Sequence, residues 1–264
     1  MKNRITFLNL LSFLIMGMLW PTSQVNGQHR LKVMTYNIHH ANPPARPDFI
    51  DIPAIAKVIN ESGAELVALQ ELDINNERSG KELDQAAELG RLTGMYHFFA
   101  KGIDFSGGEY GVAILSKYPI VSAKRYALPM VDGSGGEPRA LAMITVKPSD
   151  GPEITFASTH LDLYEENRLL QASFIVDKLT NATSTPVIFC GDLNAEPGSA
   201  VMDIFQKAFK RAVHDGPTYP QVNAKQRLDY ILYHPIEAMK AENPKIIQET
   251  YASDHLPLYV EFVL

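Results

Sequence analysis

The chain has 264 residues, 45% of them hydrophobic and 20% charged, which is the composition of a globular protein rather than a disordered or fibrous one. Its formal net charge is −6, so no broad positive surface for polyanions is expected, although a small basic cleft stays compatible with this sum. Its only cysteine, Cys190, cannot form an internal disulfide.

The N-terminus has the pattern of an export signal. Two basic residues precede an apolar run, Ile5–Trp20, and Val25 and Gly27 lie at the spacing that a signal peptidase reads. A membrane anchor is the alternative, but the run is shorter than the ~20 residues that span a bilayer. We therefore expect a cleaved signal peptide over residues 1–27, a mature domain over 28–264 with no stable membrane span, and a secreted or periplasmic location.

The next residues alternate between strand and helix patterns. Arg30–Asn37 alternates in polarity as a strand does. Asp51–Gly63 begins with Asp-Ile-Pro, carries an apolar stripe and ends at a glycine, which predicts a helix. A buried strand over Glu65–Gln70 and a second helix over Lys81–Gly94 follow.

Beyond Tyr110 the chain is richer in strand patterns. Runs of β-branched and apolar residues, separated by proline or glycine, cover 110–115, 120–127, 139–147 and 153–159. In the rest of the chain, helices are predicted over Tyr164–Leu179 and Ser199–Phe209. Strands are predicted over Pro186–Cys190, Arg227–Tyr233 and Pro257–Val263. This interleaving, without a linker-like stretch, predicts one α/β domain with layered sheets.

Polar and titratable residues adjoin several of the apolar strands. They are Asn37, Gln70-Glu71, Thr159-His160, Asp192-Leu193-Asn194 and Ser253-Asp254-His255. Each one alone has an ordinary explanation as a turn residue or a cap. As a set they indicate a site, because carboxylates and imidazoles at apolar strand ends destabilise a fold unless they are paired or bind a metal. Since ligand sites of α/β sheets form where strand ends meet loops, we expect these ends to converge on one cleft.

Other enzyme classes lack their motifs here. The sequence has no Cys-x-x-Cys, His-Glu-x-x-His, Gly-x-Ser-x-Gly or Walker-type Gly-Lys-Ser/Thr. The cluster Gly133–Gly136 lacks a following lysine and precedes Pro138, which predicts a flexible loop. A calcineurin-like phosphatase would need an Asn-His pair and a Gly-His-x-His, and both are absent.

Seven short motifs occur in the order found in the endonuclease/exonuclease/phosphatase superfamily. They are TYNI (35–38), QELD (70–73), GVAILS (111–116), THL (159–161), GDLN (191–194), RLDYI (227–231) and SDHL (253–256). The chain resembles this superfamily from about Leu31 onward; members include pancreatic-type deoxyribonuclease, abasic-site endonucleases, neutral sphingomyelinases and inositol polyphosphate 5-phosphatases. The resemblance implies a deoxyribonuclease I-like fold, a four-layer α/β sandwich of two packed mixed β-sheets flanked by helices.

The resemblance also implies which residues bind a metal and activate water. Glu71 is the expected hard oxygen ligand for Mg²⁺, with Mn²⁺ as the alternative, and Asn37 and Asp254 match residues at or near the metal. Asp192 matches the residue that positions and deprotonates the attacking water, which Asn194 holds in place.

The remaining site residues are assigned to the phosphate. His255 is expected to stabilise charge on the phosphoryl oxygens, with Asp229 orienting its imidazole. His160 matches a second active-site histidine of the deoxyribonuclease and sphingomyelinase branches. Arg139 is a candidate phosphate clamp, and Tyr110 is a candidate neighbour of the phosphate.

These roles predict an Mg²⁺-dependent phosphoric ester hydrolase that cleaves a phosphodiester or phosphomonoester by direct attack of an activated water. The sequence has no long basic or aromatic insertion that would clamp a duplex groove. The segments 75–80 and 102–110 are similar to elaborated loops of secreted bacterial members, and with 37–40 they resemble a branch linked to glycosylphosphatidylinositol-type lipids. We therefore favour a lipid head group or a small phosphoester over duplex DNA, with inositol phosphates and nucleic acid among the possible substrates.

Two alternatives stay open. The first is a secreted endonuclease that acts on DNA. The second is a binding scaffold that keeps the sandwich without catalysis, which the presence of every acid, base and metal position argues against. No protein partner is indicated, and we expect a monomer.

Overall fold

The computed structural model of the chain describes residues 29–264 apart from 150, 182–184, 214–215 and 235–238. The predicted signal peptide, residues 1–27, lies outside this part. No helix in the described part is both long enough and apolar enough to cross a membrane. In chain order the elements are β1 (Arg30–Asn37), the 3-10 helix η1 (His39–Ala41), α1 (Ile52–Ser62), β2 (Leu66–Ile74), α2 (Gln85–Thr93), β3 (Tyr96–Phe105), β4 (Gly108–Ser116), β5 (Ile120–Ala127), β6 (Ala140–Val146), β7 (Ile154–His160), α3 (Glu165–Asn181), β8 (Val187–Asp192), α4 (Ala200–Gln206), β9 (Lys210–Arg211), β10 (Asp229–His234), β11 (Lys240–Ile246) and β12 (Leu258–Val263).

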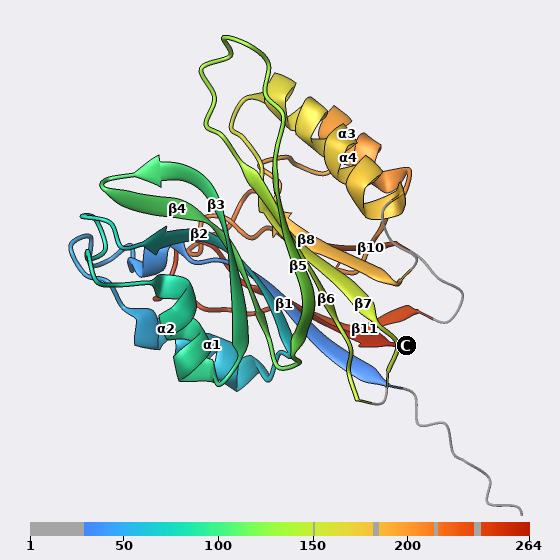
Figure 1. Cartoon of the computed structure of the whole chain (residues 1–264), viewed down its shortest axis with the longest axis horizontal. Helices are drawn as coiled ribbons and strands as arrows, with labels where there is room; N and C mark the ends of the chain where they lie inside the picture. The colour runs from blue at the N-terminus through green and yellow to red at the C-terminus, as the bar shows by residue number, and fades with distance from the viewer. Residues whose placement is uncertain (1–28, 150, 182–184, 214–215, 235–238) are drawn as a thin grey trace, which may run out of the picture.

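The strands form two mixed sheets of six strands each. Their orders are β11-β12-β1-β2-β4-β3 and β5-β6-β7-β8-β10-β9, with β1–β2 and β7–β8 as the parallel pairs. One apolar cluster fills the space between the sheets, and two more pack α1 and α2 on the first sheet and α3 and α4 on the second. The two helix pairs lie on opposite sides of the molecule (Figure 1). This arrangement confirms the predicted four-layer sandwich.

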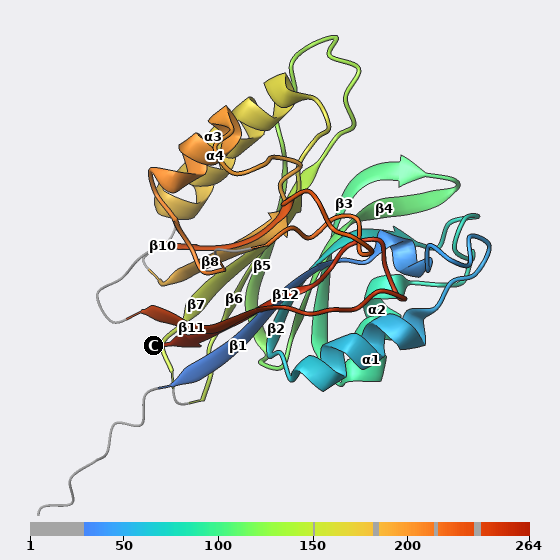
Figure 2. The same cartoon turned by 180° about the vertical axis from the view of Figure 1, so that it is seen from behind.

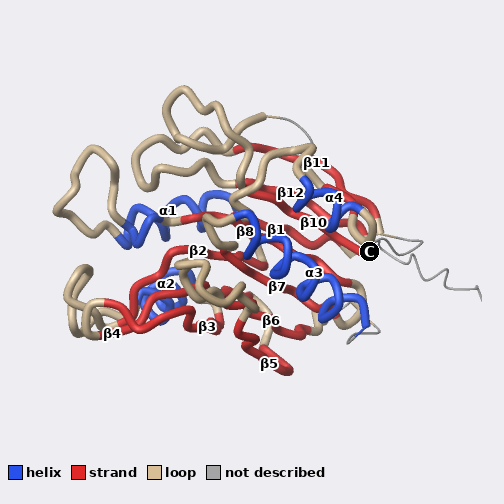
Figure 3. Tube along the Cα trace, turned by 90° about the horizontal axis from the view of Figure 1, so that it is seen from above, coloured by secondary structure: helices blue, strands red, loops and turns tan. Residues whose placement is uncertain are grey.

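The first and last strands of the domain are neighbours. β12 pairs antiparallel with β1, with Thr35 opposite Leu258, and Figure 2 shows the two strands side by side. The pairing brings the segment before β12 to the end of β1, where the Ser253 hydroxyl donates to the carbonyl oxygen of Asn37 at 2.7 Å. The longer loops lie mainly at the end of the sheets away from the C-terminus (Figure 3).

A polar bridge joins the two sheets beneath this end of the molecule. Gln70 of β2 is fully buried, and its Nε2 donates to Thr35 Oγ1 of β1 and to Ser158 Oγ of β7, each at 3.2 Å. The Ser158 hydroxyl donates in turn to the carbonyl oxygen of Leu69 at 3.3 Å. We call these residues, Thr35, Leu69, Gln70 and Ser158, the inter-sheet bridge. Buried polar groups that are mutually satisfied fix one arrangement of the elements that carry them.

Local capping explains the predicted helix boundaries. The Asp51 carboxylate accepts a hydrogen bond from the Ala54 N–H at 3.0 Å, and α1 ends at Gly63, whose φ of +67° suits glycine. The predicted start of the second helix at Lys81 was four residues early, because the Asp84 side chain caps α2 by accepting from Ala87 N–H.

Three strands were missed. β3 is half exposed on both faces and lacks a clean alternation, and β11 carries Asn243-Pro244 at a break in its register. β9 has only two residues, too few for a sequence pattern. The predicted loop over 102–110 is therefore wrong: this segment is the β3–β4 hairpin.

Candidate active site

The predicted strand ends converge on one pocket of about 530 Å³. It is lined by the polar residues Glu71, Arg78, Tyr110, Glu137, Arg139, His160, Arg168, Asp192, Asn194, Tyr219, Gln226, Asp254 and His255, together with Phe105, Leu163 and Leu228. Asn37 and Asp229 lie behind this lining and contact it. The structure thus brings together every residue that the sequence singled out, while the roles assigned to them stay predictions.

Asn37, at the end of β1, links acids from both sheets. Its Nδ2 donates to Glu71 Oε1 at 2.9 Å and to Asp192 Oδ2 at 3.0 Å, and its Oδ1 accepts from the His39 N–H at 3.1 Å. The amide therefore positions the two carboxylates, and its own oxygen is occupied by the backbone. The metal-ligand role predicted for Asn37 stays a prediction.

Glu71 lies at an irregularity of β2 rather than at its end. The strand continues past Gln70 to Ile74, and its register with β4 shifts between Leu69 and Leu72. Glu71 has a φ of +62°, a conformation that a side chain other than glycine adopts at a cost of about 1–3 kcal/mol. Such a bulge redirects the side chain, here into the pocket.

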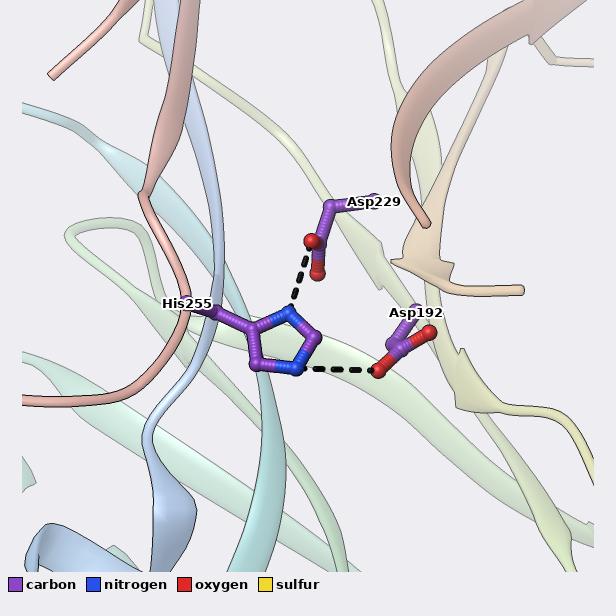
Figure 4. A group of neighbouring side chains, drawn as sticks. All are labelled: Asp192, Asp229 and His255. Carbon is purple, nitrogen blue, oxygen red and sulfur yellow. Dashed lines mark hydrogen bonds and ion pairs between the residues drawn. The ribbon is translucent and has the colours of Figure 1, made fainter. Parts of the chain in front are cut away.

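Asp229, His255 and Asp192 form a buried chain of hydrogen-bonding groups (Figure 4). His255 Nδ1 lies 2.8 Å from Asp229 Oδ2, and His255 Nε2 lies 3.7 Å from Asp192 Oδ2. Burial alone would lower the pKa of His255, but the charge and hydrogen bond of Asp229, with Asp192 and Asp254, raise this pKa to about 10. The imidazole is therefore a cation at neutral pH.

The Asp192 carboxylate is almost fully buried. Burial, followed by the charge of Asp229, raises the pKa of Asp192 to about 7, although His255 and hydrogen bonds from Asn194 and Asn37 act in the opposite direction. Its Oδ1 accepts from the Asn194 N–H at 3.0 Å. A carboxylate whose pKa lies near neutrality is suited to take a proton from water.

His160, at the end of β7, has a different environment. Its Nδ1 lies 3.2 Å from Arg139 Nη1 and its Nε2 lies 3.0 Å from Asn194 Nδ2, so donors face both ring nitrogens. Burial, then the charges of Arg139 and His255, hold the pKa of His160 well below its usual range. Asp192 Oδ2, 3.5 Å from Nε2, is the acceptor available to the neutral ring.

Arg139 begins the segment that leads into β6. Its Nη1 lies 3.1 Å from Glu137, and its buried Nε has no hydrogen-bond partner among the described residues. A buried, unpaired guanidinium N–H beside the pocket fits the predicted phosphate clamp. The preceding loop is anchored on α3, where Asn167 Oδ1 accepts from the Val131 N–H and its Nδ2 donates to Ser134 Oγ. A Cβ on Gly136 would lie 2.3 Å from Asn167 Nδ2, so the glycine allows this close approach.

Two sets of side chains could hold a metal ion. Asp192, Asp229 and His255 offer ligand atoms within 4.8 Å of one another. However, Asp229 and His255 are hydrogen-bonded to each other, and a protonated imidazole cannot bind a metal. Glu71 and Asp254 both line the pocket and offer carboxylate oxygens, the ligand type that Mg²⁺ prefers.

One wall of the pocket holds a group of residues that the sequence did not single out as a group. Arg78, Phe105 and Tyr110 lie together, with the Arg78 guanidinium 4.4 Å from the Phe105 ring centre and 5.4 Å from that of Tyr110. We call these three residues the arginine wall. Only Tyr110 was singled out as an individual residue, although Arg78 and Phe105 lie in the segments 75–80 and 102–110 that were connected with the substrate. The signal that could have revealed Arg78 is Asp73, a buried strand carboxylate that needs a cation nearby.

Comparisons with known proteins agree with this architecture. Nocturnin from Xenopus laevis is 30% identical over 42% of this chain and 37% of its own length, so the match spans little more than a third of that relative. The structure of an endonuclease/exonuclease/phosphatase from Beutenbergia cavernae has a TM-score of 0.75 at 23% identity, covering 89% of this chain and 72% of that one. A mannosyl-6-phosphatase from Bacteroides thetaiotaomicron has a TM-score of 0.73 at 20% identity, covering 89% of this chain and 100% of that one.

The family assignment rests on most of the chain. Residues 34–255 match the Endonuclease/Exonuclease/phosphatase family, a range that contains every candidate site residue described above. The fold, the arrangement of the site residues and this match all agree. The chain belongs to the endonuclease/exonuclease/phosphatase family of phosphoesterases.

Proposed function

We propose that this chain is a divalent-metal-dependent phosphoester hydrolase in which Asp192 activates the attacking water. The observation that carries the proposal is the environment of Asp192. Its carboxylate lines the pocket, has a pKa raised to about 7, and is oriented by Asn37 and the Asn194 N–H. A general base needs this combination of access, pKa near neutrality and fixed geometry.

The residues on the pocket wall fit a divalent cation. Glu71 and Asp254 would hold Mg²⁺, with Mn²⁺ as the alternative, and the ion would act as a Lewis acid on the phosphoryl oxygens. Asn37 keeps Glu71 in place, since its amide donates to Glu71 Oε1.

Two cations of the chain itself would meet the phosphate. His255 is held as an imidazolium by Asp229, and its Nε2–H is the donor on the pocket side. Arg139 has an unpartnered buried Nε–H among the described residues. Donors fixed before the reaction stabilise charge that develops on the phosphoryl oxygens, because they need no reorganisation in the transition state. His160, held neutral beside Arg139, would donate from Nε2 to Asp192 and orient this carboxylate rather than carry charge.

The pocket favours a small phosphoester or a lipid head group over duplex DNA. A volume of about 530 Å³ lies within the range of sites for small ligands. Arg78 and Arg139, two of the three arginines on its wall, are already paired with Asp73 and Glu137, which reduces the positive charge available to a polyanion. A structurally similar protein is a mannosyl-6-phosphatase, which acts on a compact phosphoester.

A substrate screen tests the proposal. Purified protein would be assayed with and without Mg²⁺ on hexose 6-phosphates, inositol phosphates, phosphatidylinositol phosphates, sphingomyelin, bis-p-nitrophenyl phosphate and plasmid DNA. We expect hydrolysis of small or lipid esters that EDTA abolishes. Faster turnover of plasmid DNA would favour the endonuclease alternative, and no metal-dependent hydrolysis of any ester would favour a binding scaffold.

We also propose export of this enzyme to the periplasm or the medium. The support is the pattern of residues 1–27, two basic residues before an apolar run and short side chains at the cleavage spacing. N-terminal sequencing of exported protein should give Gln28 or a close neighbour as the first residue. An intact Met1 in a membrane fraction would contradict this proposal.

A further inference from the structure

Tyr219 lines the active-site pocket and has no part in the proposed mechanism. Its ring packs beside the imidazole of His255, with 4.8 Å between the ring centres and 42° between the ring planes. This is the separation of a packed aromatic pair. The two nitrogens of His255 face Asp229 and Asp192 (Figure 4), so Tyr219 supplies a further, apolar contact to the same imidazole.

Thr218, the residue before Tyr219, is attached to both members of the pair that Asp229 and His255 form. Its Oγ1 accepts a hydrogen bond from the Asp229 N–H at 3.3 Å, and its carbonyl oxygen accepts one from the N–H of Leu256, next to His255, at 2.8 Å. Thr218 is fully buried. The chain that leads into the tyrosine is therefore fixed to the backbone on both sides of the pair.

The chain after Tyr219 is fixed in a similar way. The Gln221 N–H donates to the carbonyl oxygen of Asp254, the residue before the histidine, at 2.7 Å. Tyr219 itself exchanges backbone hydrogen bonds with Gln226, at 3.0 Å from its N–H and at 2.9 Å to its carbonyl oxygen. The segment 218–226 is thus bonded to the residues on either side of the histidine, and the two rings have a fixed relative position before a ligand arrives.

The hydrogen bond to Asp229 alone fixes the His255 ring incompletely. Rotation about the Cβ–Cγ bond of a histidine has broad energy minima, and a hydrogen bond stays favourable while its angle departs from linear by ~30°. Nε2 lies 3.7 Å from Asp192 Oδ2, too far for a hydrogen bond. A reacting group has to stay within roughly 10–20° of its productive geometry. The tilt that the hydrogen bond permits exceeds this range, so a second restraint is needed.

We propose that Tyr219 is a positioning residue whose ring prevents the His255 imidazole from tilting and keeps its Nε2–H directed at the phosphoryl oxygens. This inference rests on the proposed function and adds a residue to it. The Tyr219 hydroxyl makes no hydrogen bond to another described residue. The aromatic ring, and not the hydroxyl, should therefore carry the effect.

Removal of the ring tests the inference. Tyr219→Leu should lower kcat by about 3- to 10-fold on the best ester of the screen, which is the loss expected for one aromatic pair, and should leave KM nearly unchanged. Tyr219→Phe keeps the ring and should retain the kcat of the parent protein. The control is Tyr96→Leu, which removes an exposed tyrosine of β3 outside the pocket and should change neither constant.

Two further measurements separate positioning from a general structural role. Since Tyr219 acts through His255, the double variant Tyr219→Leu/His255→Ala should lose little more activity than His255→Ala does by itself. NMR of the metal-free protein gives a readout that does not depend on turnover. The ring protons of His255 should change their chemical shifts in Tyr219→Leu, because the ring current of the tyrosine is lost, and should keep them in Tyr219→Phe.

The outcomes distinguish this inference from the function on which it rests. A raised KM with kcat unchanged would mean that Tyr219 contacts the substrate, additive losses in the double variant would mean that it acts apart from His255, and equal losses in the leucine and phenylalanine variants would assign the effect to the hydroxyl. Each result overturns the inference and leaves the hydrolase standing. If the protein hydrolyses no ester with Mg²⁺, both are wrong. Tyr219→Met, which also lacks a ring, replaces Tyr219→Leu if the melting temperature of the latter shows that it is not folded.

Discussion

His160 and His255 face the same pocket and are about equally buried, with 8% and 6% of their side chains exposed, yet their pKa values move in opposite directions. Next to Asp229, His255 becomes a cation with a pKa of about 10. Next to Arg139, His160 is held neutral, with burial as the larger cause. Burial disfavours charge on both rings, so the partner on the protein side of each ring decides its charge. Two histidines of one pocket with similar burial therefore have different uses.

The largest expected effect concerns the carboxylate between the two rings. Asp192 Oδ2 lies 3.5 Å from His160 Nε2 and 3.7 Å from His255 Nε2. Asp192→Asn removes the proposed base and should lower kcat by roughly 10²–10⁴-fold, measured on the best ester of the screen. Asp203→Asn, on the exposed face of α4, is the control. Retention of more than a tenth of the activity in Asp192→Asn would mean that another group activates the water.

The next effect tests the side of the pocket near the neutral histidine. Glu71 Oε1 lies 4.0 Å from His160 Nδ1, and Glu71 is the proposed metal ligand. Glu71→Gln should lower turnover by about 10²-fold or more and weaken Mg²⁺ activation, because the ligand charge is lost. Glu82→Gln, at an exposed position, should leave the Mg²⁺ titration unchanged. Full activity of Glu71→Gln in EDTA would contradict the metal site.

A smaller effect is expected on the pH dependence that His255, the charged histidine, gives to activity. A raised pKa means that His255 keeps its proton until the pH rises through about 10, so activity that needs the cation is lost above that value. Asp229→Asn should move the alkaline limb of the pH–rate profile downward by about 1–3 pH units, since the opposite charge is gone. Because Asp229 acts through His255, Asp229→Asn/His255→Ala should be little worse than His255→Ala alone. Additive losses in this cycle, or an unmoved limb, would show that the two residues work independently.

The smallest effect is expected when the positive charge beside His160, the neutral histidine, is removed. Arg139→Gln removes the nearest positive charge from His160 and should raise its pKa, measured by NMR titration of the ring in the absence of substrate. The value should stay below the usual range, because burial is the larger cause. An unchanged titration would show that burial alone keeps the ring neutral, and the comparison of the two histidines would need another explanation.

The sequence predicted elements whose signals are local. β1 and the boundaries of α1 follow from alternation, a capping aspartate and a terminal glycine, which act within a few residues. β3 could not be predicted in this way, because its half-exposed residues depend on pairing with β4. The same division holds in the site. Motif order placed Glu71 and Asp192 together, whereas Arg78 belongs to the pocket only because the loop that carries it packs on the hairpin.

The resemblance paired His255 with Asp229, whereas the environment of His160 was beyond the sequence. The partner of His255 is 26 residues away, and that of His160 is 21 residues away, just before β6. The motifs indicated that His255 meets an acid, but nothing in their spacing indicated that His160 meets Arg139. The fold decides this, because pairing of β6 with β7 brings the start of β6 near His160, and packing of the two sheets brings the segment before β12 to Asp229 of β10.

The inter-sheet bridge affects how accurately the two sheets align the residues of the site. Apolar faces packed together resist separation strongly but resist a small lateral slip weakly, since dispersion contacts have little directionality. Gln70 bonds to both sheets at 3.2 Å, and hydrogen bonds weaken steeply with misalignment. Its hydrogen bonds therefore fix the lateral position of one sheet relative to the other, and each sheet carries half of the site. A protein with a leucine in place of this glutamine could stay folded at the same temperature and still lose the alignment of Glu71 with Asp192, so thermal stability and alignment can vary separately in this fold.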